Sequence, residues 1–238
     1  MHRVAFTVDV EQDAPPFMAT WRGMNEGMPP LLALLSRHGV RATFFVTGAA
    51  ASRFPQLIAE ISRNHEVGCH GYDHERFDRL PVAEQRARIR AATDILQQIT
   101  GAKPSGFRAP NFRCTADTLK ILAELGYTYD ASAAMYHRAN HDRDTSIVRL
   151  ANTLPSSVLR LPSLLARSIL VTCTRFSEPV VLDQHPWELV PMSGLRPDMR
   201  FATGHEAIKR LDGLLAWLTS RGVHFVLMRD IAAERMHG

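Results

Sequence analysis

Short apolar segments alternate with helical patterns along almost the whole chain, and this alternation restricts the fold more than any other feature of the sequence. Apolar runs between turn signals are typical of buried strands, whereas apolar residues at the spacing of one helix face indicate helices. The pattern predicts helices at residues 28–39, 54–64, 81–101, 115–126 and 205–222, and strands at residues 3–10, 41–48, 65–70, 105–110, 127–132, 158–162, 179–185 and 224–228.

Strands that alternate with helices form a parallel sheet, which either closes into a barrel or stays open with helices on both faces. Seven or eight strands in 238 residues favour a (β/α) barrel, complete or incomplete. The sequence has no internal repeat, low-complexity tract or linker, so we predict a single domain over residues 1–238. Functional variation is expected in the long loops at residues 11–27, 132–153 and 186–203.

The charge balance argues against a nucleic-acid-binding protein. Lys and Arg number 28 against 24 Asp and Glu, and the net charge of +4 is scattered without a basic run. Such a mild excess suits an anionic small substrate or peripheral contact with an acidic membrane surface.

Several features favour a cytoplasmic location. The three cysteines, Cys69, Cys114 and Cys173, have no CxxC spacing, which fits a reducing compartment. The N-terminus meets acidic residues before any apolar core of a signal peptide. No apolar run approaches the roughly 20 residues of a transmembrane helix, so no transmembrane segment is expected.

Polar side chains gather where the predicted strands end. Because ligands of parallel α/β folds bind at the carboxyl ends of the strands, these residues are the first candidates for a site. Asp9 and Glu11 stand two positions apart on one strand, so their side chains leave the same side of the backbone. The other strand-end candidates are His70, His74, Arg108, Asn111 and His185.

One carboxylate with two imidazoles is a common ligand set for a catalytic divalent metal, and a second carboxylate can act as base on metal-bound water. Taken singly, each signal has a structural reading. A loop HxxxH is usually a polar turn, strand-end acids often cap helices or form ion pairs, and Arg108 could pair with a surface acid. The shared position of these residues favours the metal site.

Four motifs carry a family resemblance: FTVDVEQD, CHGYDH, FRAPNF and LDQHPWE. In this order, from residue 4 to about 230, the chain resembles the polysaccharide deacetylase family, carbohydrate esterase family four. RATFFVTG and GVHFVLMRDI also look like family features. The resemblance implies a distorted (β/α) barrel and metal-dependent removal of an acyl group from a sugar.

The resemblance assigns Asp9 as general base, and His70 and His74 as metal ligands. The family's metal-binding acid usually follows the base directly, but here that position holds Val10. In an Asp-Val-Asp/Glu branch the acid two positions along binds the metal, which makes Glu11 the expected ligand and Asp13 the alternative.

The resemblance also implies roles for the later motifs. Arg108 would hold the base, and a backbone N–H near Asn111 would help bind an oxyanion, although the family often has tyrosine there. The family's late histidine is absent from VLMRD, where Arg229 stands. LDQHPWE resembles a related branch that carries a histidine-proline-tryptophan-glutamate turn at this place, which implies His185 as general acid. The fallbacks are His205 and His224, and Asn111, Trp187 and Tyr72 are predicted substrate contacts.

The sequence therefore predicts a metal-dependent hydrolase that removes an N-acetyl or other acyl group from an amino sugar, with a nucleotide-linked, lipid-linked or small glycosylated substrate. The metal is expected to be zinc, with cobalt, nickel or manganese as alternatives. Two other readings stay open: an amidohydrolase or deformylase of a non-sugar molecule, and an inactive binding module. The oligomeric state is open, as is the role of loop 132–153, which could be a lid, a dimer contact or a substrate clamp.

Overall fold

The computed structural model describes residues 3–135 and 147–237, which form two compact units built from non-contiguous parts of the chain. Unit 1 comprises Met1–Ala42 and Thr153–Val226, and unit 2 comprises Thr43–Asn152 and Leu227–Gly238. The prediction of a single domain stays a prediction. None of the described helices is both long enough and apolar enough to cross a bilayer.

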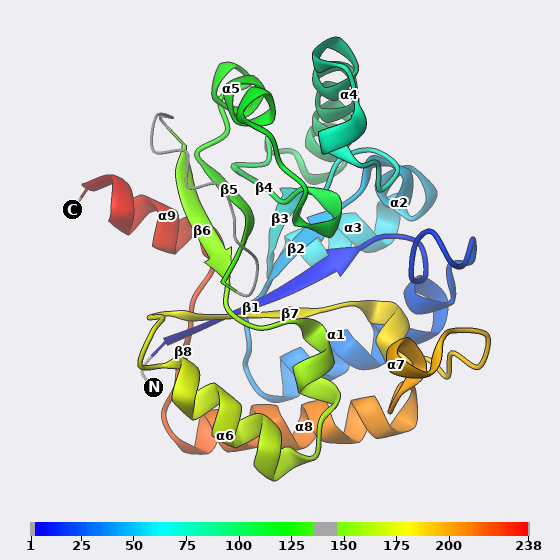
Figure 1. The fold of residues 1–238 in the computed structure, drawn as a ribbon, viewed down its shortest axis with the longest axis vertical. Helices are drawn as coiled ribbons and strands as arrows, with labels where there is room; N and C mark the ends of the chain where they lie inside the picture. Colours follow the sequence, from blue (N-terminus) through cyan, green and yellow to red (C-terminus); the bar gives the residue numbers. More distant parts are fainter. Residues whose placement is uncertain (1–2, 136–146, 238) are drawn as a thin grey trace. The chain divides into compact units, whose positions relative to one another are not determined.

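Unit 1 is organised around the buried strand β1, which pairs in parallel with β7 and β8 (Figure 1). Seven of the eight residues of β1 are buried, as its continuous apolar sequence predicts. Helix α1 begins with prolines in its first turn, where no intrahelical N–H is lost. The elements of this unit are β1 (Arg3–Val10), η1 (Gly23–Gly27), α1 (Met28–Arg37), η4 (Ser156–Arg160), α6 (Ser163–Cys173), β7 (Val180–Gln184), η5 (Pro186–Leu189), α7 (Pro197–Arg200), α8 (His205–Ser220) and β8 (His224–Phe225).

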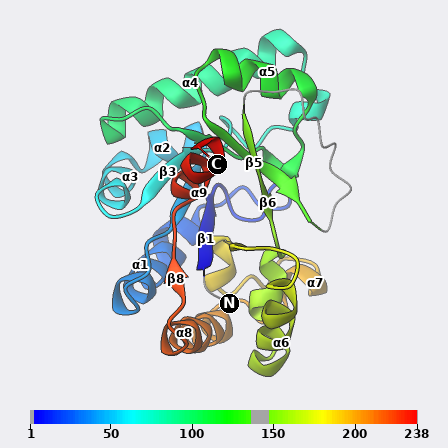
Figure 2. The same cartoon turned by 90° about the vertical axis from the view of Figure 1, so that its left-hand side faces the viewer.

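Unit 2 contains five parallel strands in the order β6-β5-β4-β3-β2, and β5 and β6 lie side by side in Figure 2. Its helices follow the predicted periodicity: α4 buries Ile89, Ala92 and Leu96, and the Thr115 side chain caps α5. The elements are β2 (Thr43–Val46), α2 (Gly48–Arg53), α3 (Pro55–Ser62), β3 (Glu66–Cys69), η2 (Phe77–Arg79), α4 (Val82–Thr100), β4 (Gly106–Phe107), η3 (Pro110–Phe112), α5 (Ala116–Glu124), β5 (Tyr129–Ala134), β6 (Val148–Asn152) and α9 (Met228–His237).

Two predicted strands are wrong in part or in whole. Residues 158–162 do not form a strand. Val158, Leu159 and Arg160 lie in the 3-10 helix η4, where Arg160 turns inward to a buried acid. The strand expected at 224–228 stops at Phe225. Helix α9 starts at Met228, whose backbone N–H donates to the buried Thr43 hydroxyl at 3.1 Å.

The loop expected at residues 132–153 is shorter than predicted. Strand β5 continues to Ala134, and Val148–Asn152 forms the unpredicted strand β6. Residues 136–146 lie outside the described part of the chain, so the lid, dimer and clamp interpretations of this loop stay untested.

A buried carboxylate joins three elements of unit 2. Glu66 of β3 is 2% exposed and accepts hydrogen bonds from the Thr43 hydroxyl at 2.6 Å, the Tyr129 hydroxyl at 2.7 Å and the Arg229 N–H at 3.1 Å. Burial raises the pKa of Glu66, although these donors oppose the shift. The acid therefore connects β2, β5 and the start of α9.

Gly106 leaves the space that the Tyr129 ring needs for its hydrogen bond to Glu66, because a Cβ at Gly106 would overlap the ring. We expect Gly106→Ala to lower the free energy of unfolding by about 3 kcal/mol, through overpacking and loss of that hydrogen bond. Gly213→Ala is the control. Gly213 lies inside α8 with open space around it, so alanine should raise the free energy by about 1 kcal/mol. Urea unfolding measures both, and equal effects would contradict the packing argument.

Candidate active site

The parallel pairing of β1 with β7 places an acid and a histidine side by side in unit 1. Thr7 pairs with Asp183, and Asp9 and His185 each follow two positions later. One donor atom each of Asp9, Asp183 and His185 lies within 4.8 Å of the other two. The base and the acid predicted from sequence therefore lie next to each other at the carboxyl ends of adjacent strands.

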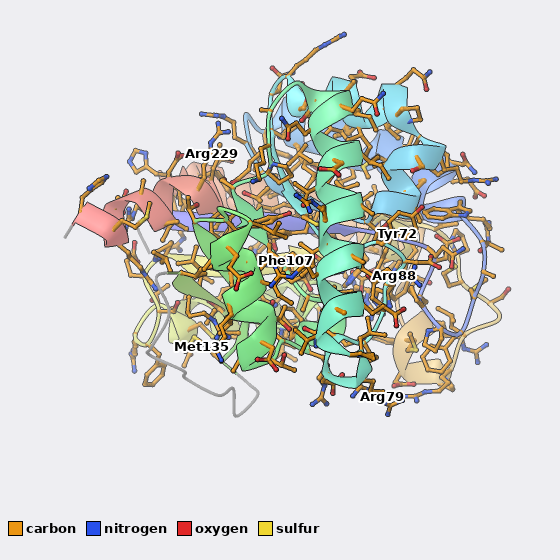
Figure 3. All side chains as sticks on the ribbon, turned by 90° about the horizontal axis from the view of Figure 1, so that it is seen from above. Tyr72, Arg79, Arg88, Phe107, Met135 and Arg229 are labelled. Carbon is orange, nitrogen blue, oxygen red and sulfur yellow. The ribbon has the colours of Figure 1, made fainter. Side chains whose placement is uncertain are left out.

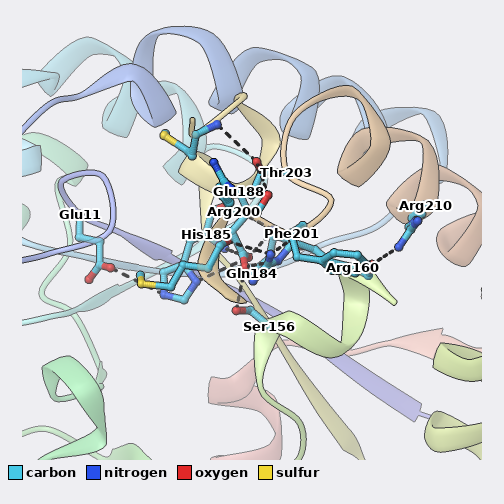
Figure 4. A network of polar contacts seen from close by, with 12 residues as sticks. Glu11, Ser156, Arg160, Gln184, His185, Glu188, Arg200, Phe201, Thr203 and Arg210 are labelled. Carbon is cyan, nitrogen blue, oxygen red and sulfur yellow. Dashed lines mark hydrogen bonds and ion pairs between the residues drawn. The ribbon is translucent and has the colours of Figure 1, made fainter. Parts of the chain in front are cut away.

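The two candidate acidic ligands differ in their surroundings. Asp13 accepts hydrogen bonds from the Thr20 hydroxyl at 2.6 Å and from the backbone N–H groups of Arg22 at 2.6 Å and Gly23 at 2.8 Å. Its carboxylate thus fixes the loop after β1. The Glu11 carboxylate instead lies 3.7 Å from Nε2 of His185 (Figure 4), which favours Glu11 over Asp13 as the residue that acts in the site.

The Glu188 carboxylate is fully buried and accepts hydrogen bonds from two segments of unit 1 (Figure 4). Glu188 accepts hydrogen bonds from the Ser156 hydroxyl at 3.0 Å, Arg160 Nε at 2.9 Å, Gln184 Nε2 at 2.7 Å and the His185 backbone N–H at 3.2 Å. Arg160 also donates to the carbonyls of Met199 and Phe201. The network holds the turn that carries His185, and the strand-end argument did not predict it.

The acidic surroundings of His185 favour its protonated form. Burial lowers the pKa of His185, but Asp183, Glu188 and Glu11 together outweigh burial and hold that pKa well above its ordinary value. An imidazolium at this position can donate a proton to a leaving group, as a general acid requires.

Trp187 lies beside His185, with ring centroids 5.5 Å apart. The indole is only 7% exposed and packs against Ala14, Val190 and Met192, so it forms an inner wall next to the imidazole. Its Nε1–H has no hydrogen-bond partner among the described residues. The sequence prediction of Trp187 as a substrate contact stays a prediction that this geometry fits.

Unit 2 contains two histidines, His70 and His74, that follow β3. Their rings lie 5.9 Å apart between centroids, and Nδ1 of His70 donates to the Arg108 carbonyl at 2.7 Å. That bond fixes the tautomer, so Nε2 of His70 carries the lone pair that a metal needs. His74 has a φ of +55°, an uncommon conformation for a residue other than glycine. The turn is thus held in a specific shape.

The Arg108 motif forms a tight turn after β4. Arg108 is completely buried, and its guanidinium lies over the Phe45 ring, 4.3 Å from the centroid. Asn111 adopts a φ of +55°, which asparagine tolerates better than most residues. The Ala109 N–H donates to the Ser132 hydroxyl at 2.7 Å, and that hydroxyl donates to the Asp130 carboxylate. Ser132 and Asp130 therefore position this turn.

Tyr72 stands between His70 and His74 in the sequence and lies near Arg88 of α4 (Figure 3). The Arg88 guanidinium is 5.7 Å from the centroid of the half-exposed Tyr72 ring. Its predicted role in substrate binding stays a prediction.

The fallback histidines lie elsewhere in unit 1. His224 is exposed and pairs with Arg3, at the opposite end of β1 from Asp9. His205 is exposed at the first turn of α8. Neither lies in the cluster that contains Asp9, which favours His185 as the acid.

The Arg160–Glu188 pair generates a stability prediction. Arg160→Met leaves Glu188 buried without its counter-charge, so we expect the free energy of unfolding to fall by about 3 to 5 kcal/mol. The double variant Arg160→Met/Glu188→Leu removes both charges and should recover most of that loss. Urea denaturation of the single and double variants tests the pair. A double variant as unstable as Arg160→Met would contradict this account.

Comparisons with known proteins agree with the motifs. The family model for polysaccharide deacetylase matches residues 3–129. A peptidoglycan deacetylase from Helicobacter pylori is 30% identical over 142 residues, which cover 54% of this chain and 48% of that protein. A peptidoglycan-N-acetylglucosamine deacetylase from Bacillus cereus is 29% identical over 56% of this chain and 50% of its own length. The chain therefore matches about half the length of these relatives.

Solved structures match nearly all of the chain. A Mycobacterium smegmatis protein named for the polysaccharide deacetylases is 26% identical with a TM-score of 0.76, over 98% of this chain and 89% of its own. The Puue allantoinase has a TM-score of 0.75 at 17% identity, over 98% and 89% of the two chains, a likeness of fold alone. The predicted fold class, a distorted (β/α) barrel of seven to eight parallel strands, is confirmed. With its family model matching more than half of the residues, this chain belongs to the polysaccharide deacetylase family.

Proposed function

We propose that this protein is a metal-dependent hydrolase that removes an N-acetyl or other acyl group from an amino sugar. The observation that carries the proposal is the pair formed by Asp9 and His185 at the ends of β1 and β7. A carboxylate that accepts a proton and an imidazolium that donates one are the two groups that amide hydrolysis needs, because the carbonyl is a poor electrophile and the amine a poor leaving group.

Glu11, His70 and His74 are the proposed metal ligands. Their carboxylate and imidazole donors suit zinc, with cobalt, nickel or manganese as alternatives. The hydrogen bond from His70 Nδ1 to the Arg108 carbonyl supports this assignment, because metal-binding histidines almost always donate their other N–H in this way.

When bound, the metal supplies Lewis-acid activation of the acyl carbonyl and of a water molecule. In the proposed mechanism Asp9 accepts the proton of the attacking water, and the buried Arg108 keeps Asp9 oriented and ionised. A backbone N–H near Asn111 donates to the oxyanion that forms on the substrate. His185 then protonates the nitrogen of the departing amine.

The proposed substrate is an acylated amino sugar inside the cell, linked to a nucleotide, a lipid phosphate or a small metabolite. The excess of basic residues supports a phosphate-bearing substrate. All three cysteines are free thiols, in agreement with a reducing compartment. The names of two relatives support an amino-sugar substrate for the proposed reaction, because they give peptidoglycan and N-acetylglucosamine as what those proteins act on.

A second candidate is an amidohydrolase of a non-sugar molecule, because the fold of an allantoinase covers nearly all of this chain. An inactive binding module is the third, because Val10 and Arg229 depart from the family pattern. A screen of acetate release from N-acetylglucosamine derivatives, run beside ring opening of cyclic ureides, separates the two enzymes. Turnover of neither class would favour the binding module.

The general acid can be tested by substitution. We expect His185→Ala to lower kcat for acetate release by about 100-fold or more while metal content stays normal, since His185 acts on the leaving group. His224→Ala is the matched control and should keep wild-type turnover, because His224 is exposed at the far end of β1. If His185→Ala kept full activity, the general acid would be a residue other than His185.

Metal content tests the proposed ligands. Chelation should abolish acetate release, and a divalent metal should restore it. His70→Ala and His74→Ala should each purify with at least about tenfold less metal by elemental analysis, because each removes a donor. Asp13→Asn, which changes the carboxylate that fixes the loop after β1, should retain the metal. The opposite result, with metal lost in Asp13→Asn and kept in the histidine variants, would refute the assignment.

A further inference from the structure

Helix α6 of unit 1 exposes an apolar face that the proposed reaction does not use. Leu164 is 80% exposed, Leu165 49%, Val171 47% and Phe176, just after the helix, 73%. Leu164 and Val171 stand seven positions apart, so they lie on one side of the helix. Scattered exposed apolar residues are normal, but four within one short segment are not.

The polar residues on this face do not offer their hydroxyl hydrogens to solvent. Ser168 donates to the Leu164 carbonyl at 2.9 Å, and Thr172 donates to the Ser168 carbonyl at 2.9 Å. Just beyond the helix, Thr174 donates to the Val171 carbonyl at 2.7 Å. These back-bonds satisfy the hydroxyl donors within the helix, so the face can enter an apolar medium at little cost.

Arginine and tryptophan border the apolar face. Helix α6 lies beside α8 in both views of the ribbon (Figures 1 and 2), and Arg167 donates to the Gly213 carbonyl at 3.1 Å. The guanidiniums of Arg167 and Arg221 lie 5.4 Å and 5.1 Å from the centroid of the Trp217 ring. An amphipathic aromatic ring close to cations suits a boundary between water and lipid.

The positive charge around the apolar face favours an anionic partner. The sequence has no Asp or Glu from residue 145 to 177 or from 213 to 229, the two stretches that contain the face and its border, whereas Arg167, Arg175 and Arg221 lie within them. A second copy would bring the same cations together. An anionic lipid surface instead complements them and accepts the apolar side chains.

We propose that the apolar face of α6, bordered by Trp217 and these arginines, is a docking surface for an anionic phospholipid membrane. Leu164, Val171 and Phe176 enter the boundary between headgroups and acyl chains, and the guanidiniums contact lipid phosphates. The proposal does not rest on the enzymatic activity.

Vesicle co-sedimentation of the full chain tests the docking surface. We expect binding to vesicles of phosphatidylcholine with phosphatidylglycerol, weak binding to pure phosphatidylcholine, and a loss of affinity as salt rises. The triple variant Leu164→Gln/Val171→Gln/Phe176→Gln should bind roughly 100-fold more weakly, since three apolar contacts are lost. Arg175→Glu/Arg221→Glu should weaken binding by roughly tenfold or more at low salt.

A matched control makes the same type of change elsewhere. Phe17, Val82 and Met236 are 45 to 55% exposed, and their triple glutamine variant should bind vesicles as the wild type does. Brominated lipids should quench the fluorescence of the wild type more than that of Trp217→Phe. Several outcomes would overturn the proposal: no binding to anionic vesicles at low salt, equal losses in the two triple variants, or a dimer that only the α6 variant dissociates without any vesicle binding.

Discussion

The parallel pairing of β1 with β7 is the interaction on which the candidate site of unit 1 depends. It aligns Thr7 with Asp183, so Asp9 and His185 emerge two positions later from neighbouring strands. Side chains alternate between the faces of a strand, so a shift of one residue would turn one of these groups away. The positions of these polar groups therefore depend on the pairing of apolar residues earlier in the two strands. Val4, Ala5 and Phe6 of β1 pair with Val180, Val181 and Leu182 of β7.

Much of the candidate site could be predicted because its chemistry follows directly after strands. Asp9, His70, Arg108 and His185 all stand at strand ends, and the alternation of short strands with helical patterns located these ends in the sequence. The strand pattern alone did not distinguish Glu11 from Asp13, and the family resemblance supplied the preference for Glu11. The structure adds the partners of Asp13, whose carboxylate accepts hydrogen bonds from the N–H groups of Arg22 and Gly23 in the loop after β1.

The residues that sequence reasoning missed act through partners far away in the chain. Ser132 supports the turn at Ala109 across 23 positions, and Arg160 meets Glu188 across 28. The same limit explains the errors in the fold. Val158 and Leu159 look like a strand until Arg160 is known to turn inward. Helix α9 has a weak apolar stripe, and the acceptors of its first N–H groups, Thr43 and Glu66, lie far away in the sequence. No local pattern contains this information.

The buried pair of Arg160 and Glu188 is better understood as a positioning device than as a source of stability. Replacing a buried ion pair with apolar groups is often neutral or stabilising, because two charges must lose their hydration. Here, however, the Glu188 carboxylate accepts hydrogen bonds from Gln184 and the His185 N–H, at either side of the point where β7 ends. Four donors that converge on one acceptor leave the backbone between Gln184 and Glu188 little freedom, so the imidazole faces Asp9 and Trp187 in a fixed orientation. An apolar pair could fill the same volume, but it could not specify that orientation.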